Sequence, residues 1–223
     1  MNDSRIALAK AALFVLCLLP LAYYAVGATA DTLGANPIEA VTRGLGTWAL
    51  NLLLVTLAIT PLRRLTGQAW LIRLRRSLGL FAFFYAVLHL GCYLWLDQFF
   101  DWHAIAKDIL KRPFITVGMV AFALLVPLAA TSNAFAIRRL GGRRWVALHR
   151  AVYAIGILAV LHYGWMVKAD LRFPLVYAAL LAGLLGIRAW WRGQELAHQR
   201  AGGRGRSGPA ANRRRVIPLA VRK

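Results

Sequence analysis

The sequence predicts an all-α polytopic membrane protein, a bundle of about six transmembrane helices with both termini in the cytoplasm. Apolar residues make up 60% of the 223-residue chain and the mean hydropathy is +0.56, yet the formal net charge is +20. These values coexist only if apolar and basic segments alternate. Apolar runs of about 16 to 20 residues, enough to cross the core of a bilayer, recur along the chain. These runs lie near residues 11–27, 45–61, 78–96, 115–131, 148–167 and 173–190.

The first apolar run, 11–27, could be confused with a secretory signal peptide. However, the segment LAYYAVGATADTLGA at its end offers only a weak small-residue cleavage site, and five more runs follow. We therefore expect the first run to be retained as a transmembrane helix. The two cysteines, Cys17 and Cys92, both fall in apolar runs, so we expect no structural disulfide.

The charges of the connecting segments predict the orientation, because cytoplasmic loops retain Lys and Arg. Segment 62–77 and the segment after the fourth run are basic and contain no acid, and the tail from Arg188 onward is also strongly basic. Segments 28–44, 97–112 and 168–172 are nearly neutral. We therefore expect the basic segments and both termini inside the cell, and the nearly neutral segments outside.

Two regions of different composition are expected. Residues 1–192 should form the membrane domain, and residues 193–223 a disordered basic cytoplasmic tail, because the tail is rich in Arg, Gly and Ala and has little to pack. Arg-Gly composition also occurs in RNA-binding segments. A basic segment beside an anionic leaflet already explains this tail, so we expect no nucleic-acid partner.

Three histidines, His89, His149 and His162, lie within apolar runs. A titratable side chain at membrane depth costs free energy unless something satisfies it, so each is a candidate functional residue. Histidines that face one another from neighbouring helices can hold a haem by its iron, with the bundle core as a dry cavity. We therefore expect these three residues to be haem-iron ligands and the protein to transfer electrons. The chain has no C-x-x-C-H motif for covalent haem attachment.

The pairing of these histidines is left open by helix geometry. On the expected topology the third and fifth runs are parallel, so depths can be compared at about 1.5 Å per residue. His149 should lie near the inner edge, His162 about 20 Å further out, and His89 between them. A haem between His89 and either partner is reachable by tilt or offset. His149 and His162 do not share a face of a straight helix, although Gly156 could permit a bend.

Two other histidines are expected to lie outside the membrane. His103 would share a helix face with His89 if that helix continued, but the polar stretch DQFFDW between them argues that it does not. His198, in the polar stretch ELAHQR, should be an exposed tail residue. A buried histidine can also be a hydrogen-bonded core residue that ties helices together. Three histidines at membrane depth on two runs favour the haem interpretation instead.

Arginines flank the runs that carry the histidines, on the side expected inside. Arg75 and Arg76 precede the third run, Arg143 and Arg144 precede the fifth, and Arg150 lies at the start of the fifth. Because haem propionates are anionic and guanidinium groups bind carboxylates well, we expect Arg75 and Arg76 to contribute to cofactor binding. The predicted membrane orientation by itself also favours arginines at the cytoplasmic ends of these runs, so their presence adds only modest support for haem binding.

Four stretches of the chain carry a resemblance to a known family: LGANPIEAVTRGLGTWALNLLLVTLAITPLRR, IRLRRSLGLFAFFYAVLHLGCY, KRPFITVGM and TSNAFAIRRLGGRRWVALHRAVYAIGILAVLHYGWMVK. They resemble the MsrQ (YedZ) family, haem-binding membrane subunits of the bacterial periplasmic methionine sulfoxide reductase system, within the ferric-reductase-like transmembrane superfamily. They occur in the family's order and cover most of residues 33–168. Each stretch is weakly diagnostic alone, but their joint order is specific.

The resemblance implies a multi-pass b-type cytochrome of the bacterial inner membrane with one or two haems and an associated FMN. Electrons would come from the quinone pool or a cytosolic flavin reductase. They would pass to MsrP, a periplasmic molybdopterin subunit that forms a heterodimer with the membrane subunit and reduces methionine sulfoxide in oxidised proteins, so catalysis would belong to the partner. By resemblance, His89, His149 and His162 are haem ligands. His103 matches no MsrQ position, although the wider superfamily has a second histidine about there.

Other function classes remain open. No Gly-rich dinucleotide-binding turn follows the last apolar run, so we do not expect this chain to oxidise NAD(P)H by itself. A free-standing ferric or quinone reductase-like cytochrome is the nearest alternative. A non-haem transporter or scaffold, with histidines that relay protons or bind a metal, is a more distant one. Proton relays generally use intramembrane Asp or Glu, and none of the apolar runs contains either.

Overall fold

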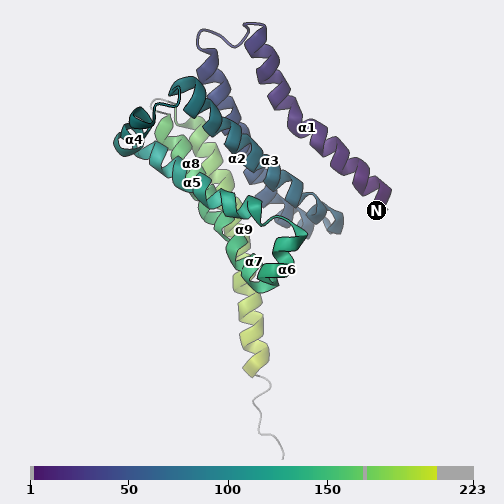
Figure 1. Cartoon of the computed structure of the whole chain (residues 1–223). Helices are drawn as coiled ribbons and strands as arrows, with labels where there is room; N and C mark the ends of the chain where they lie inside the picture. The colour runs from purple at the N-terminus through teal and green to yellow at the C-terminus, as the bar shows by residue number, and fades with distance from the viewer. Residues whose placement is uncertain (1–2, 168–169, 205–223) are drawn as a thin grey trace, which may run out of the picture. The chain divides into compact units, whose positions relative to one another are not determined.

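The computed structural model describes residues 3–167 and 170–204, which are helical with short connections and contain no strand (Figure 1). One 3₁₀ segment, Ala69–Arg73, precedes α3, and one π-helical turn, Tyr93–Asp97, follows it. The α-helices are α1 (Asp3–Thr29), α2 (Pro37–Thr66), α3 (Arg75–Cys92), α4 (Trp102–Lys111), α5 (Pro113–Ala130), α6 (Ala134–Leu140), α7 (Gly142–His149), α8 (Ala151–Met166) and α9 (Arg172–Arg204).

Within the described residues, six helical segments are long and apolar enough to cross a membrane, which confirms the predicted all-α polytopic membrane fold. Each matches one of the apolar runs recognised in the sequence, and no run extends more than one residue beyond its segment. The third combines the 3₁₀ segment, α3 and the π-helical turn, and the fifth combines α7 with α8. These segments are Asp3–Thr29, Pro37–Thr66, Ala69–Asp97, Pro113–Ala130, Gly142–Met166 and Arg172–Gln199.

Local sequence signals define both ends of α2. The Asn36 side chain accepts a hydrogen bond from the Glu39 backbone N–H (3.1 Å) and donates one to the Glu39 carboxylate (3.1 Å), so the first turn is capped reciprocally. Pro37 occupies the first helical position, where a missing N–H costs nothing. The helix ends at Gly67, which has a φ of 69° and so takes the left-handed conformation that glycine tolerates best.

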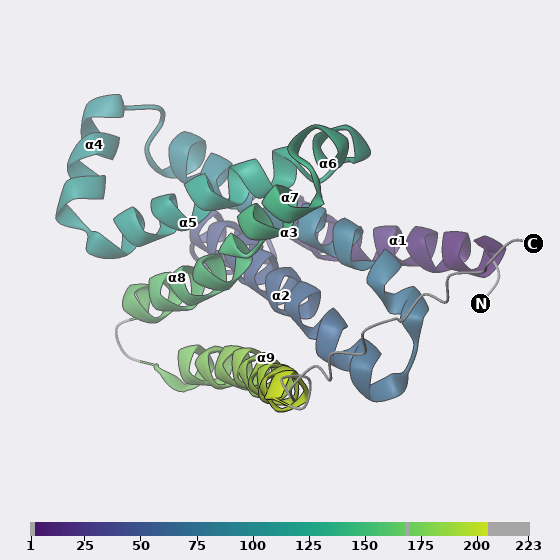
Figure 2. The same cartoon turned by 90° about the horizontal axis from the view of Figure 1, so that it is seen from below.

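Two helix pairs form the centre of residues 1–185. α2 packs along α3, and α5 packs along α8; these are the most extensive helix contacts, and α3 with α5 and α2 with α8 join the two pairs. Figures 1 and 2 show α5 beside α8 from two directions. His89 of α3 contacts the paired helix α2, and His162 of α8 contacts the paired helix α5.

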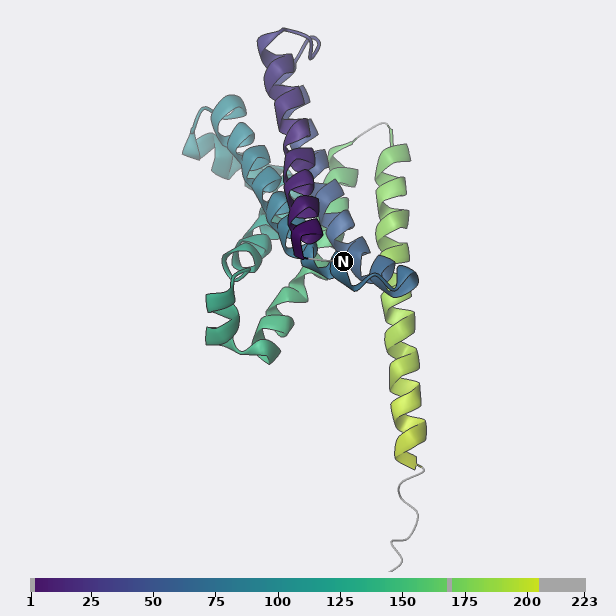
Figure 3. The same ribbon diagram turned by 90° about the vertical axis from the view of Figure 1, so that its right-hand side faces the viewer.

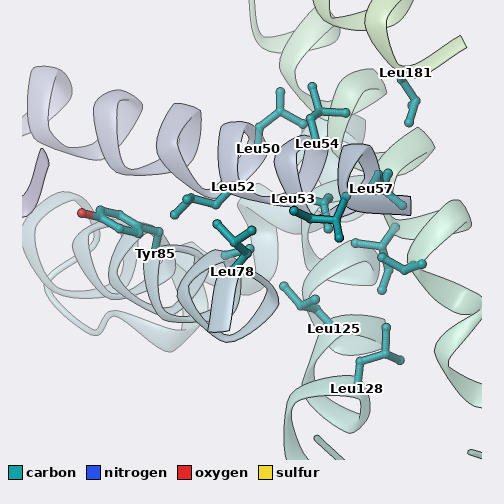
Figure 4. Packing of buried hydrophobic residues seen from close by; sticks show 14 of the residues in the cluster. Leu50, Leu52, Leu53, Leu54, Leu57, Leu78, Tyr85, Leu125, Leu128 and Leu181 are labelled. Carbon is teal, nitrogen blue, oxygen red and sulfur yellow. The ribbon is translucent and has the colours of Figure 1, made fainter. Parts of the chain in front are cut away.

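Leucines of α2 make up much of the apolar core (Figure 4). Leu57 is fully buried, and Ile155 of α8 is 2% exposed. Gly156 of α8 allows close packing there, because a Cβ atom at that position would lie 3.2 Å from Cδ1 of Leu181 and 3.6 Å from Cδ1 of Leu57. Side chains of α2 and of the first part of α9 therefore pack directly against the backbone of α8 at Gly156.

Tyr85, which is also fully buried, links α3 to α1. Its hydroxyl donates to the carbonyl oxygen of Cys17 (2.6 Å) and accepts from the backbone N–H of Leu21 (3.1 Å). Pro20 lies in the same turn of α1 and has no N–H to donate. The hydroxyl therefore satisfies backbone groups where the helix is locally interrupted. Cys17 and Cys92 are free thiols, as expected.

The connecting segments contain more helix than the sequence analysis suggested. α4 occupies most of segment 97–112, and Asp101 caps it by accepting hydrogen bonds from the backbone N–H groups of His103 and Ala104, both at 3.0 Å. α6 and α7 follow α5. Figure 3 shows α4 and the α6–α7 pair at opposite ends of α5. Segment 62–77 is also largely helical, since α2 extends to Thr66 and α3 starts at Arg75.

The chain divides into two compact units, residues 1–185 and 186–223. The expected boundary was residue 192, with a disordered tail beyond it. α9 instead continues as a helix to Arg204, so the first part of that tail is helical. An uninterrupted run of residues without proline from 175 to 204 is compatible with this extension. The rest of the predicted tail, 205–223, lies outside the described residues.

Candidate haem site

His89 lies in the last turn of α3 and faces α2. Its Nδ1 atom is 2.8 Å from the backbone carbonyl oxygen of Thr42. Because a carbonyl oxygen can only accept, Nδ1 carries the proton and Nε2 has the free lone pair. Nε2 makes no hydrogen bond to another described residue. This tautomer suits a metal ligand, since ligating imidazoles generally donate their second N–H to a carbonyl or carboxylate.

His162 repeats this arrangement on the other helix pair. It lies on α8, and its Nδ1 atom donates to the backbone carbonyl oxygen of Phe114 on α5 (2.6 Å). Its Nε2 atom also has no hydrogen-bond partner in the described part of the chain. The Phe114 ring lies beside the imidazole, with ring centres 6.2 Å apart. Each helix pair therefore presents one imidazole with a defined tautomer.

The two imidazoles are neighbours, with ring centres 6.1 Å apart and ring planes inclined by 72°. A first-row metal lies about 2.0–2.1 Å from an imidazole nitrogen, so two imidazoles on opposite sides of one ion have ring centres roughly 6.3 Å apart. The observed spacing therefore suits one metal ion between the rings. From helix geometry His89 was expected between the depths of the other two histidines, with either partner possible. In the structure its ring lies beside that of His162.

The donor set also fits a macrocycle better than a bare ion. Among the described residues, no group of three or more His, Cys, Asp or Glu side chains could hold a metal. Two imidazoles would leave most coordination positions of a bare ion empty, whereas porphyrin nitrogens supply four ligands and need only axial ones from the protein. Both histidines lie within membrane-spanning segments, which provide the apolar surroundings that such a group requires.

His149 belongs to a separate cluster at the other end of α8. Its ring stacks on Trp145, with centres 3.9 Å apart, and its Nε2 atom lies 3.0 Å from the Thr131 hydroxyl. That hydroxyl donates its proton to the Pro127 carbonyl oxygen (2.6 Å), so Nε2 of His149 is the donor. Trp145 also donates to the Thr131 carbonyl oxygen (2.9 Å). In this arrangement His149 ties α7 to α5 and has no contact with the other two histidines, so its role as a haem ligand stays a prediction.

If His89 and His162 hold a haem, replacing His149 with alanine should leave that haem in place, because His149 touches neither ring. The expected result is retained low-spin haem and unchanged axial ligation, measured by visible spectra and haem quantitation on purified protein. If the protein binds two haems, H149A should lose the other one. An H149A protein that inserts normally but contains no haem would contradict the separation of the two clusters.

Arg75 and Arg76 start α3, fourteen and thirteen residues before His89. This separation corresponds to about 20 Å along the helix, so neither arginine lies beside the paired imidazoles. The Arg75 charge instead acts on His149. The predicted role of these arginines in binding an anionic cofactor group thus concerns the His149 end of the bundle, where it stays a prediction.

The two histidines expected outside the membrane are exposed. His103 lies in the first turn of α4, after the chain has left α3 and the π-helical turn, so it does not continue the helix of His89. Its backbone N–H takes part in the Asp101 cap, but its side chain points to no partner among the described residues. His198 is exposed in α9.

Comparison with known proteins agrees with this architecture. Residues 45–160 match the family model described as "Ferric reductase like transmembrane component", a range that includes His89 and His149 and ends just before His162. The chain is also 63% identical over 180 residues to the "Protein-methionine-sulfoxide reductase heme-binding subunit MsrQ" of Azospira oryzae, covering 80% of this chain and 77% of that protein. The chain belongs to the MsrQ family.

Other members of the MsrQ family match over a longer range. The protein of the same name from Herminiimonas arsenicoxydans is 52% identical over 202 residues, or 90% of this chain and 93% of the relative. The one from Rhodospirillum rubrum is 58% identical over 181 residues, or 81% and 87%. The expected family and its ferric-reductase-like transmembrane architecture are therefore confirmed.

Sequence reasoning missed the residues that surround the paired imidazoles. The two acceptors are backbone carbonyls of Thr42 and Phe114, whose side chains gave no indication of this role. Gly46 and Gly118 lie directly against the two rings. A usable signal was the position of these glycines near the start of the second and fourth apolar runs, but no sequence pattern connects them with histidines more than forty residues away.

Proposed function

We propose that this chain binds haem b between His89 and His162 and is the membrane electron-transfer subunit of a protein-methionine-sulfoxide reductase. The observation that carries the proposal is the pair of imidazoles 6.1 Å apart, each with Nδ1 hydrogen-bonded to a helix carbonyl and Nε2 unpaired within the described chain. The relatives' name, a haem-binding subunit, supports it. Bound haem would supply a reversible one-electron couple within the membrane.

The protein residues have three tasks in this proposal. The carbonyl groups of Thr42 and Phe114 select the ligating tautomer and raise the basicity of each imidazole. The apolar helices around the pair exclude water, which favours a tightly held cofactor and limits side reactions with solvent. The cluster of His149, Trp145 and Thr131, with Arg75 nearby, would hold a second haem if the protein carries two. FMN is proposed on family resemblance alone.

The orientation follows from charge. We propose that the Arg-rich segments and both termini face the cytoplasm in a bacterial inner membrane. α2 and α5 then begin on the periplasmic side, and the carbonyls of Thr42 and Phe114 lie within the first two turns of these helices. The His89–His162 pair would therefore lie near the periplasmic surface, and His149 near the cytoplasmic one. This arrangement suits electron entry from a quinone or a cytosolic flavin reductase, and exit to a periplasmic MsrP-type molybdopterin subunit.

Oriented vesicles test the direction of transfer. The full chain is reconstituted with one orientation, reduced from the cytoplasmic face and mixed with a purified MsrP-type protein. We expect that protein to oxidise the reduced chain when it is added at the periplasmic face, and not when it is enclosed at the cytoplasmic face. Transfer only at the cytoplasmic face would contradict both the direction and the assigned role.

The same vesicles separate the proposal from its alternatives. The ferric-reductase-like family match leaves a free-standing reductase as the nearest second candidate. Oxidation by a ferric chelate or a soluble quinone, without oxidation by the MsrP-type protein, would favour that candidate. A colourless protein after haem-replete expression would favour a transporter or scaffold. The H89A and H162A variants, reconstituted in the same way, are the controls for nonspecific reduction.

A further inference from the structure

Two glycines lie against the paired imidazoles in the same manner. A Cβ atom built on Gly46 would lie 3.0 Å from both Nδ1 and Cε1 of His89 and 3.4 Å from its Cγ. A Cβ atom built on Gly118 would lie 2.8, 2.9 and 3.3 Å from the corresponding atoms of His162. In both cases the Nδ1–Cε1 edge of the ring is nearest. These distances are shorter than an ordinary van der Waals contact, so an alanine at either position would displace the ring.

Each glycine is also four residues after the carbonyl that accepts the Nδ1 hydrogen bond. Gly46 follows Thr42, and Gly118 follows Phe114. In an α-helix the carbonyl of residue i points toward residue i+4, whose Cβ atom therefore stands beside it. The carbonyl has a second lone pair that remains available after its intrahelical bond. A side chain at i+4 would cover this lone pair, whereas glycine leaves it open to a donor from the next helix.

The two sites are thus copies of one arrangement on two helix pairs. α2 supplies Thr42 and Gly46 to His89 of α3, and α5 supplies Phe114 and Gly118 to His162 of α8. The other glycines of α3 and α8 near the histidines differ. A Cβ atom on Gly91 would meet nothing within 4 Å, and one on Gly164 would make only an ordinary contact, 3.8 Å from Pro174.

We propose that Gly46 and Gly118 are positioning residues for the two axial ligands. The missing side chain at each position lets an imidazole reach the helix carbonyl four residues earlier, and this contact fixes the ring plane and directs Nε2 toward the shared cofactor space. The inference rests on the proposed haem function. Among the described residues, Nδ1 of each ring bonds a backbone carbonyl and no side chain. The two glycines explain how each ring can reach that carbonyl and so keep a defined orientation.

The first test substitutes alanine at each glycine in the full chain. G46A and G118A should each bind haem roughly 10- to 100-fold more weakly, as is typical when the partner of a metal-bound histidine is disturbed. Any haem retained should have altered electron paramagnetic resonance (EPR) g-values and an altered midpoint potential, because the ring plane and the Nδ1 hydrogen bond change. G91A and G164A, two residues beyond His89 and His162, are matched controls that should behave like the parent protein.

A thermal-stability cycle tests the contact without relying on haem. G46A is combined with H89A, and G118A with H162A, and melting temperatures are measured on the purified full-length proteins. Each glycine substitution should lower the melting temperature of the parent but not of the variant that lacks the facing imidazole. In that background, alanine should be neutral or stabilising, since it limits the unfolded chain more than glycine does.

The outcomes separate this inference from the proposed function. Equal loss of melting temperature with and without the imidazole would overturn the inference, since the glycines would then serve only helix packing. Parent-like haem affinity and g-values in G46A and G118A would also overturn it. If the parent protein binds no haem, the proposed function fails, while the stability cycle still reports on the contact. If G46A aggregates, normal insertion of G46A/H89A supports the inference and its aggregation contradicts it.

Discussion

Replacing either His89 or His162 with alanine is expected to abolish the haem that they bind together. In the proposed function each imidazole is one of two axial ligands, and the rings lie on different helix pairs, so no neighbouring histidine should substitute. His149 is engaged with Trp145 and Thr131 elsewhere. Haem quantitation and visible spectra of purified H89A and H162A should show the same loss in both variants.

The control for this loss is His103→Ala. His103 is exposed in the first turn of α4, and only its backbone takes part in the cap, so H103A should keep the parental haem content. Normal membrane insertion of each variant is verified by size-exclusion chromatography of a fluorescent fusion. Full haem content and an unchanged spectrum in an inserted H89A protein would remove His89 from the site. Loss of haem in H103A would instead indicate an axial ligand outside the proposed pair.

Leu57→Ala should produce a large loss of stability. Leu57 is fully buried where α2 crosses α8 beside Gly156. A glycine at the crossing cannot fill the space left by the deleted side chain, so the cavity should persist. Truncation of a buried leucine typically costs about 2–5 kcal/mol. The expected result is a lower melting temperature of the purified protein in detergent.

Val55→Ala is the matched control for this substitution. Val55 lies on the same helix two residues earlier, but it is 45% exposed on the outer surface of the fold. Its truncation should therefore change the melting temperature little. Equal effects of V55A and L57A would indicate that the α2–α8 crossing does not determine stability.

Hydropathy predicted the membrane spans well because each span must be apolar along most of its length. The short helix α4 was missed for the opposite reason. Its sequence WHAIAKDILK is amphipathic and mixes charged with apolar residues, so it was interpreted as a polar connection. The helical end of the sixth span was also missed, since the Arg- and Gln-containing segment before Arg204 has a composition that suggested disorder.

The candidate site was only partly predictable. The histidines could be recognised because polar side chains are rare at membrane depth. Their pairing depended on where α3 and α8 begin, and the break at Arg150 between α7 and α8 was not evident in the sequence. The carbonyl acceptors could not be predicted, since a backbone contact between distant helices leaves no residue-type signature, and the two glycines could not be connected with the histidines from sequence alone.

In the proposed site, two imidazoles from different helix pairs ligate one haem iron. The most direct measurement is low-temperature EPR of the oxidised purified protein, combined with haem quantitation. We expect at least one noncovalent haem per chain and a low-spin signal of strong anisotropy, because the ring planes are inclined by 72° and far from parallel. A protein without haem, or one with only high-spin iron, would contradict bis-histidine ligation by His89 and His162.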